Sequence, residues 1–396
     1  MDEVGEIDSK ADVLSIITKL RKAGHPALLV TEVITQARLR TRAKAKFGDF
    51  AKNLLFTEAG LEQATRLQVA AMHAERFKEN GFTNIADLGS GIAADSMAFA
   101  ALGLSVTAVE QDSTTAALAA YNLAAFPNAK VVVADATTFD TSGFDALWLD
   151  PARRDLERKS AKHITLTPAD FSPNLDWCYS QAKPKGIKLG PAFPLDLIPS
   201  SVEAQWVSHQ GDLVELTLWF EGLTQKVGRS ALMMRDGKRY LFDGDGSERA
   251  SIKAVGNYIY EPDSSLIRSQ LLGEFANQLN LSSVSDGIAY LTNDELVESP
   301  WLKTYEVLEN LPLDEAAIIR SISKTKCAVT VEEHNIIGGL GDSVAQVAAK
   351  HFPIPIEYIG TNDTFGESGT PTQLLTKYGL DTPFIVAAAE KVIARK

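Results

Sequence analysis

The 396-residue sequence contains only two cysteines, Cys178 and Cys327, and they lie far apart in the chain. Neither belongs to a CxxC motif or stands at the spacing of a Cys/His zinc site, so neither a disulfide framework nor a zinc centre is indicated. We expect two reduced, buried thiols and no metal site.

Long apolar runs and an excess of cations are absent as well. No run approaches the roughly 20 residues of a membrane helix, and residues 1–10 lack the basic start and apolar stretch of a signal peptide. We therefore expect a soluble, cytoplasmic protein without membrane contact. The formal net charge of −12 excludes a surface that is basic everywhere, so contact with a nucleic acid must be local.

The apolar patterns divide the chain into four regions. Residues 1–80 show helical spacing and predict several packed helices. Residues 81–221 contain short apolar runs, the first of them separated by alanine-rich helical segments, which predicts an α/β fold with a Rossmann-like, doubly wound sheet. Residues 222–311 are rich in turn signals such as Asp236-Gly237 and predict a small α+β region. Residues 312–396 are typical of a separate α/β module.

Seven runs are expected as strands of this sheet, and most are uniformly apolar, as in strands covered on both faces. They are Ile85–Leu88, Val106–Val109, Lys130–Val133, Ala146–Leu149, Gly186–Leu189, Ala204–Val207 and Leu213–Phe220. The last run alternates, which favours an antiparallel and more exposed strand.

A glycine loop follows the first strand-like run. Asp87 lies within that run, and Gly89, Ser90 and Gly91 come directly after it, before a helical segment. Glycines at this point let the backbone approach a ligand at a helix N-terminus. The loop does not match GxGxxG, because Ala94 stands where the third glycine would be, so a dinucleotide is not indicated.

Carboxylates end the next three runs. Glu110 lies 23 residues after Asp87, where a carboxylate can accept hydrogen bonds from two ribose hydroxyls. Asp135, followed by Ala136, is placed to accept from an adenine amino group. Asp150 ends the fourth run, and all of these positions face the crevice where open α/β sheets bind ligands. The alternative is that each carboxylate merely caps the following helix.

These residues resemble the motifs of class I S-adenosylmethionine-dependent methyltransferases. That resemblance implies a cofactor, S-adenosylmethionine, bound by Asp87, Gly89, Ser90, Gly91, Glu110, Asp135 and Ala136. Residues 11–310 further resemble a bacterial methyltransferase family with a THUMP-like C-terminal region. The motifs that carry this resemblance are Arg38-Leu39-Arg40 through Phe47, Leu55-Phe56-Thr57, Leu61 to Thr65, Leu149 to Arg154, Pro173 to Trp177 and Tyr260-Glu261-Pro262. Ser90 and Ala93 replace a cysteine and a glycine that are frequent in that family.

The segment Asp150-Pro151-Ala152-Arg153-Arg154 stands where enzymes that methylate base amines carry an Asn/Asp-Pro-Pro-Tyr motif. We predict Asp150, Pro151, Arg153 and Arg154 as the catalytic residues. A carboxylate and a neighbouring carbonyl can accept the hydrogens of an amine and align its nitrogen with the methyl group. An arginine replaces the aromatic residue that stacks on the base, and a guanidinium can stack or bind phosphate. A salt-bridged loop is the alternative.

Two basic clusters predict an RNA partner bound through phosphates. They are Arg38, Arg40, Arg42, Lys44 and Lys46, and Arg153, Arg154, Arg158, Lys159 and Lys162. The alternative for the first cluster is a solvated helix face. The expected function is methyl transfer to a base amine of rRNA or tRNA, and a small-molecule or protein acceptor is the competing hypothesis.

The tail from about residue 312 to residue 396 closely resembles the C-terminal domain of transketolase-type enzymes, which implies a role in oligomerisation. Thiamine diphosphate sites of that family use Gly-Asp-Gly and a downstream asparagine pair. Gly244-Asp245-Gly246 is present, but only Asn277 follows, so we interpret the glycines as a turn. His334 with Glu332-Glu333 is likewise expected to support a glycine-rich turn. A transketolase-related protein in which the tail is the functional module is the second alternative.

Overall fold

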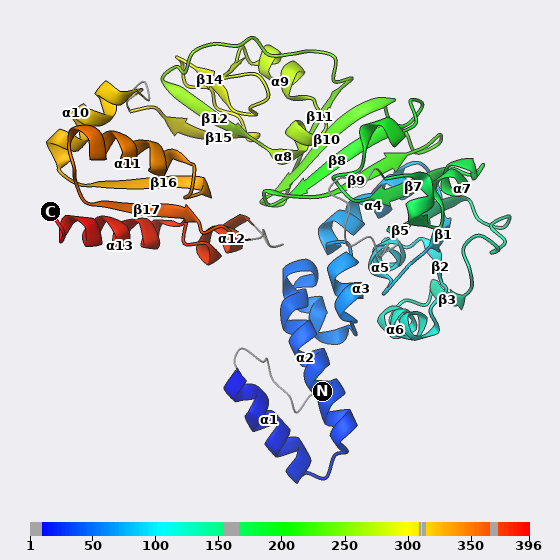
Figure 1. Cartoon of the computed structure of the whole chain (residues 1–396). Helices are drawn as coiled ribbons and strands as arrows, with labels where there is room; N and C mark the ends of the chain where they lie inside the picture. The colour runs from blue at the N-terminus through cyan, green and yellow to red at the C-terminus, as the bar shows by residue number, and fades with distance from the viewer. Residues whose placement is uncertain (1–9, 154–165, 309, 311–313, 365–370) are drawn as a thin grey trace. The chain divides into compact units, whose positions relative to one another are not determined.

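The computed structural model describes residues 10–153, 166–308, 310, 314–364 and 371–396 (Figure 1). Within these residues the chain forms two compact units. The first contains residues 10–254 and 260–304, and the second contains residues 255–259 and 305–396.

Helices occupy the start of the first unit, as the periodicity predicts. They are α1 (Lys10–Lys22), α2 (Ala27–Phe47), the 3₁₀-helix η1 (Gly48–Asn53), α3 (Glu58–Gln63) and α4 (Leu67–Glu79). Leu20 of α1 packs with Val30 and Ile34 of α2 in a small apolar cluster. The other end of α2 buries Leu39 and Phe47 in a larger cluster. The expected helical region is therefore present.

A nine-stranded sheet forms the centre of the first unit. Its strands are β1 (Asn84–Leu88), β2 (Ser105–Glu110), β3 (Ala129–Val133), β4 (Ala146–Leu149), β7 (Lys185–Leu189), β8 (Glu203–His209), β9 (Asp212–Trp219), β10 (Gly228–Arg235) and β11 (Lys238–Gly244). Their order is β11-β10-β8-β9-β7-β4-β1-β2-β3. The helices α5 (Ala94–Ala101), α6 (Ser113–Leu123) and α7 (Leu175–Ser180) follow β1, β2 and the β4 segment in sequence.

The strands β3, β2, β1, β4 and β7 are parallel, and β9 pairs antiparallel with both β7 and β8. All seven expected strands are present, and the antiparallel direction of the last is correct. Its expected exposure is wrong, because β9 lies between two neighbours and its last five residues are buried.

The expected strand number is too small, since β10 and β11 extend the sheet beyond residue 221. β10 pairs parallel with β8, and β10 and β11 form a hairpin. Asp236 and Gly237 connect them with φ angles of 52° and 72°, the left-handed pair that a tight hairpin turn needs. The Asp-Gly signal thus marks a hairpin of the main sheet rather than a turn of a separate region.

A smaller α+β part follows the main sheet. Its sheet has the order β13-β14-β12-β15. The elements are β12 (Tyr258–Pro262), α8 (Ser264–Arg268), α9 (Leu272–Gln278), β13 (Ser282–Ser283), β14 (Leu291–Asn293) and β15 (Leu302–Glu306). Gly244 ends β11, and the Asp245 side chain beside it accepts a hydrogen bond from the Ser247 backbone N–H. This turn geometry agrees with the interpretation of Gly244–Gly246.

The second unit contains an α/β module. Its elements are α10 (Glu315–Thr325), β16 (Ala328–Asn335), α11 (Leu340–His351), β17 (Ile356–Thr361), α12 (Pro371–Lys377) and α13 (Thr382–Ile393). β16 and β17 are parallel, with α11 on one side and α13 on the other (Figure 1). Glu332 accepts hydrogen bonds from the backbone N–H groups of Leu340 and Gly341 at 2.7 and 2.8 Å. The glutamate therefore supports the glycine-rich turn, as expected.

The core beneath the main sheet is aromatic. Phe77 of α4 and Phe99 of α5 pack at 5.0 Å between ring centroids, and Trp148 of β4 lies 5.8 Å from Trp219 of β9. Burying a large apolar side chain of this kind stabilises a fold by about 1.5–3 kcal/mol. His73 lies within the same cluster, 4.3 Å from Trp148. In the described parts of the chain, no helix has the length and apolar character that crossing a membrane requires.

Candidate active site

The glycine loop, residues 89–91, lies between the ends of β1 and β4. Gly89 has φ +85°, and a Cβ atom there would lie 3.1 Å from the backbone oxygen of Asp150. Gly91 has φ +54° with open space around it. The N–H groups of Gly89 and Ser90 both donate to the Val109 carbonyl of β2. Glycine is thus required at position 89 by conformation and by space.

Asp87 lies below this loop and is almost completely buried. Its Oδ2 accepts a hydrogen bond from the Ser96 hydroxyl at 2.5 Å, whereas its Oδ1 and the hydroxyl of Ser90 have no partner in the described structure. Burial raises the pKa of Asp87 to about 8, and the charges of Asp95 and Asp150 add to this shift. Unpartnered buried polar atoms are uncommon in proteins, so these two fit a polar ligand at the loop.

Glu110 ends β2 on the other side of the loop. Its Oε2 accepts from the Gly91 N–H at 3.1 Å and its Oε1 from the Asp112 N–H at 2.9 Å. A carboxylate offers about four acceptor positions, which leaves room for ligand hydroxyls.

Asp135 and Ala136 lie beyond the end of β3. The Asp135 Oδ1 accepts hydrogen bonds from the backbone N–H and the hydroxyl of Thr137, and these bonds lower the pKa of the carboxyl group. Asp135 is exposed. Oδ1 of Asp135 is thus used in a local turn, and no helix lies among the described residues between β3 and β4, so the alternative of a helix cap does not apply to Asp135.

Asp150 follows β4 and forms an ion pair with a buried lysine, which the sequence does not predict. Its Oδ2 lies 2.6 Å from Nζ of Lys188 on β7, and 32% of the Asp150 side chain is exposed. Burial raises the pKa of Asp150, and the Lys188 ammonium acts against that rise.

A cluster of buried charges lies behind this pair. His73 of α4 is fully buried between Asp95 of α5 and Glu215 of β9, at 2.8 Å from Nδ1 and 2.6 Å from Nε2. Burial alone would lower the pKa of His73, but the two carboxylates raise it to about 9. The imidazole is therefore a cation at neutral pH. Sequence reasoning missed His73, Lys188 and Glu215; one available signal was Glu215, an acidic residue between the apolar Val214 and Leu216 of β9.

The first basic cluster does not form a continuous basic surface. Arg40 donates to the Leu54 carbonyl, and Arg42 pairs with Glu58. The Lys46 ammonium donates to the carbonyls of Leu61, Glu62 and Ala64, and burial, with Arg66 and Lys188, lowers its pKa to about 8. Arg40 and Lys46 therefore hold the chain between η1 and α4.

Pro151 is buried and Arg153 is exposed on the short strand β5 (Ala152–Arg153), which pairs with β6 (Phe171–Ser172). Arg154 and the remaining cations of the second cluster, Arg158, Lys159 and Lys162, lie outside the described residues.

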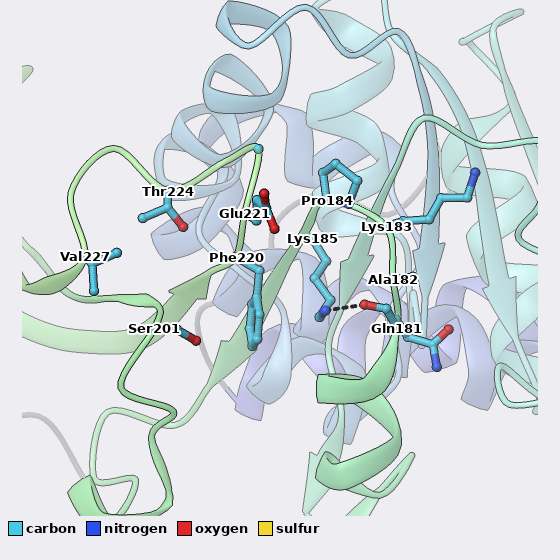
Figure 2. Close-up of a pocket in the computed structure, with 11 residues that line it drawn as sticks. Gln181, Ala182, Lys183, Pro184, Lys185, Ser201, Phe220, Glu221, Thr224 and Val227 are labelled. Carbon is cyan, nitrogen blue, oxygen red and sulfur yellow. Dashed lines mark hydrogen bonds between the residues drawn. The ribbon is translucent and has the colours of Figure 1, made fainter.

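A pocket of about 840 Å³ lies at the opposite end of β7, away from the glycine loop. Figure 2 shows Lys185 beside the ring of Phe220, while Lys183 points away. The Lys185 ammonium lies 4.2 Å from the ring centroid and donates to the Gln181 carbonyl. In an open α/β sheet, ligands bind outside the carboxyl ends of the strands, so this pocket is separate from the candidate site. Within the described ranges no group of three or more His, Cys, Asp or Glu side chains could hold a metal ion.

Comparisons with known proteins agree with this geometry. An uncharacterized S-adenosylmethionine-dependent methyltransferase of Mycobacterium tuberculosis (strain ATCC 25618 / H37Rv) is 26% identical over 299 residues, which cover 73% of this chain and 80% of that protein. A crystal structure from Porphyromonas gingivalis W83, designated a methyltransferase, superposes with a TM-score of 0.61 and 17% identity, covering 90% of this chain and 96% of that one. At that identity the superposition shows the fold alone.

The ends of the chain match other families. Residues 309–385 match the family "Transketolase, C-terminal domain", and residues 1–43 match a domain of unknown function, DUF8688. The 6-deoxy-6-sulfo-D-fructose transketolase subunit SqwH of Clostridium sp. (strain MSTE9) is 42% identical over 85 residues, which cover 22% of this chain and 26% of that subunit. The chain thus spans about a quarter of that relative's length.

The predicted class, an S-adenosylmethionine-dependent methyltransferase, is confirmed by the homology and the fold, and so is the cofactor that this class uses. The transketolase-type C-terminal module is confirmed as well. The THUMP-like character of residues 222–311 stays a prediction.

Proposed function

We propose that this methyltransferase acts on an exocyclic base amine of RNA. The observation that carries the proposal is Asp150. Its carboxylate ends β4 beside the glycine loop, one oxygen is held by Lys188, and about a third of the side chain is open to solvent. The free oxygen of this carboxylate can accept a hydrogen bond from the N–H of a base amine.

The residues around the glycine loop fit the cofactor. Bound S-adenosylmethionine supplies an electrophilic methyl group. Asp87 Oδ1 and the Ser90 hydroxyl offer polar atoms without partners among the described residues, and Gly89 and Gly91 add no side chain to the loop. Glu110 has acceptor capacity for ribose hydroxyls, and Asp135 with Ala136 is assigned to the adenine end.

The acceptor end works chiefly by alignment. Methyl transfer forms a nitrogen–carbon bond, breaks the sulfonium's carbon–sulfur bond and leaves one surplus proton on the nitrogen. The Asp150 carboxylate accepts one hydrogen of the amine, which directs the nitrogen lone pair towards the methyl group, and the surplus proton passes to Asp150 or to water. Alignment of this kind lowers a barrier by about 7–11 kcal/mol at most.

Exposed Arg153, followed in sequence by Arg154, is proposed to bind RNA phosphate or to stack on a base. The test is tritium transfer from labelled S-adenosylmethionine into total RNA of a strain that lacks this gene. Label in the RNA fraction supports the proposal, and label only in protein or solutes assigns a different acceptor. The RNA signal should also fall steeply as salt rises, since phosphate contacts release counterions.

For the transketolase-type module we propose a role in oligomerisation of the full chain. The observation that favours it is the match of residues 309–385. Sedimentation equilibrium of the intact protein should show a concentration-dependent dimer, and a monomer throughout the micromolar range would contradict this role. Calorimetry with thiamine diphosphate and magnesium addresses the competing transketolase-related function, for which binding of thiamine diphosphate would be required.

A further inference from the structure

Lys188 is held in one position by buried partners. It is the fourth of the five residues of β7 and is 9% exposed. Its ammonium contacts Asp150 Oδ2 at 2.6 Å, donates to the Thr65 hydroxyl oxygen at 3.0 Å and reaches the Gln63 carbonyl at 3.4 Å. An ammonium has three donor hydrogens, so each has a partner.

The charges behind Lys188 keep its ammonium protonated. The Thr65 hydroxyl donates to Asp95 Oδ2 at 2.6 Å, and Asp95 and Glu215 share His73. Burial lowers the pKa of Lys188, but Asp150, Asp95 and Glu215 more than reverse this, and the net shift is upwards.

The two carboxylate oxygens of Asp150 differ in their contacts. Oδ2 is used by Lys188, whereas no described residue contacts Oδ1 with a hydrogen bond or ion pair. The charged groups that face this pair are Asp87 on β1, Asp95 on α5, Glu215 on β9, and Lys46 on α2, with His73 on α4 behind Asp95 and Glu215. Asp87, Asp95 and Glu215 disfavour a charge on Asp150, and Lys188 is the cation in direct contact with it.

We propose that Lys188 is a positioning residue for methyl transfer, which holds Oδ2 of Asp150 so that the ionised Oδ1 is turned towards the donor hydrogen of the acceptor. The assignment of that acceptor as an RNA base amine rests on the proposed function. The effect of Lys188 on Asp150 is independent of which acceptor is methylated. Without the ammonium, the surrounding carboxylates and the burial of Asp150 favour a protonated carboxyl group, which would offer the acceptor a poorer and differently oriented oxygen.

The direct test is a titration of Asp150 by NMR in full-length protein labelled with ¹³C at the aspartate carboxyl carbon. The resonance is assigned by its loss in Asp150→Asn. In the wild type we expect Asp150 to be ionised at pH 7. In Lys188→Met we expect its pKa to rise by at least about one unit, because the contacting opposite charge is lost.

The kinetic test compares the same proteins at saturating S-adenosylmethionine. Lys188→Met should lower kcat for methyl transfer at pH 7 by about 10- to 100-fold, and the acidic limb of the pH profile should move upwards with the NMR pKa. Affinity for S-adenosylhomocysteine, measured by calorimetry, should stay within about threefold. A purely structural role of Lys188 would leave the pH profile in place.

Two variants serve as controls. Lys185→Met removes a buried lysine from the same strand, but that ammonium bonds Gln181 at the other end of β7, so the titration of Asp150 should not change. Lys188→Gln keeps a hydrogen-bond donor without the charge and covers the case in which the methionine variant does not fold.

A protonated Asp150 in the wild type at pH 7, or an unchanged Asp150 pKa in either folded Lys188 variant, would overturn the proposal. If tritium enters protein or solutes instead of RNA, RNA is rejected as the methyl acceptor. The NMR titration then still shows whether Lys188 controls the ionisation of Asp150.

Discussion

The two halves of the sheet's carboxyl edge hold their charged side chains by different means. In the half formed by β2 and β3, Glu110 and Asp135 lie near the surface and accept hydrogen bonds from loop N–H groups. In the half formed by the ends of β4 and β7 and the start of the antiparallel β9, Asp150, Lys188 and Glu215 belong to a network in which charges face one another. A substitution in the first half should cost ligand contacts, and one in the second should also leave an uncompensated buried charge.

The largest expected effect is on turnover. Asp150→Ala should reduce methyl transfer by about 10²–10³-fold, a loss typical of a group that acts mainly in the transition state. Affinity for S-adenosylhomocysteine should remain within about threefold. Radiolabel transfer and calorimetry give the two values, and a loss of cofactor affinity as large as the loss of turnover would place Asp150 in the cofactor half instead.

Among the predicted effects on the free energy of unfolding, the largest should follow from removal of the buried His73 imidazolium. His73→Leu leaves Asp95 and Glu215 without their shared partner, and we expect the free energy of unfolding to fall by about 3–5 kcal/mol. Urea unfolding measures this. His209→Leu is the matched control, because His209 is only partly buried and bonds Gln68, so its loss should cost less than about 1 kcal/mol.

Stability should also decrease as the solution becomes alkaline. The pKa of His73 is about 9 in the folded protein and about 6.5 when unfolded. The stabilisation is therefore complete below pH 6.5 and is lost as pH rises through 9, for a total of about 3 kcal/mol. Urea midpoints at pH 6.5 and 9.5 test this, and His73→Leu should show a much smaller difference between the two pH values.

In the half formed by β2 and β3, if Glu110 binds the ribose as proposed, Glu110→Ala should weaken cofactor binding by about 10- to 100-fold, which corresponds to a charge-assisted hydrogen bond of about 1.5–3 kcal/mol. The free energy of unfolding should fall by no more than about 1 kcal/mol, since Glu110 is only half-buried. If its loss destabilises the fold as strongly as that of His73, the contrast between the two halves is incorrect.

The smallest effect is expected in the glycine loop. Gly91→Ala should cost about 1 kcal/mol of stability, the penalty of a left-handed backbone for an L-residue, because no atom lies near its Cβ position. Gly89→Ala has the same penalty plus the contact with Asp150. Thermal unfolding of the pair should rank Gly89→Ala as the less stable, and an equal loss would show that the contact is easily relieved.

The sequence predicts the local parts of this molecule well. Alternation of apolar runs and helical segments predicts the strands that carry Asp87, Glu110 and Asp150, because strand ends and glycine loops depend on neighbouring residues. The hairpin of β10 and β11 was assigned to the wrong region, since an Asp-Gly turn indicates a hairpin without indicating which sheet it joins.

The buried network could not be predicted, because its contacts join distant residues. His73 and Glu215 are separated by 142 positions, and Lys188 and Thr65 by 123. A single histidine on an apolar helix face gives no sign that a carboxylate bonds each of its two ring nitrogens. Lys46 shows the same difficulty, since a lysine in a basic stretch gives no indication that backbone carbonyls surround its ammonium.

Gly89 leaves little room beside the Asp150 backbone oxygen, because a Cβ atom at this position would lie 3.1 Å from it. The Asp150 N–H also donates to the Leu88 carbonyl, so residues 88 and 89 lie against both the N–H and the C=O of Asp150. A side chain introduced at position 89 would therefore press on the backbone of Asp150 itself, so its effect should extend beyond the glycine loop.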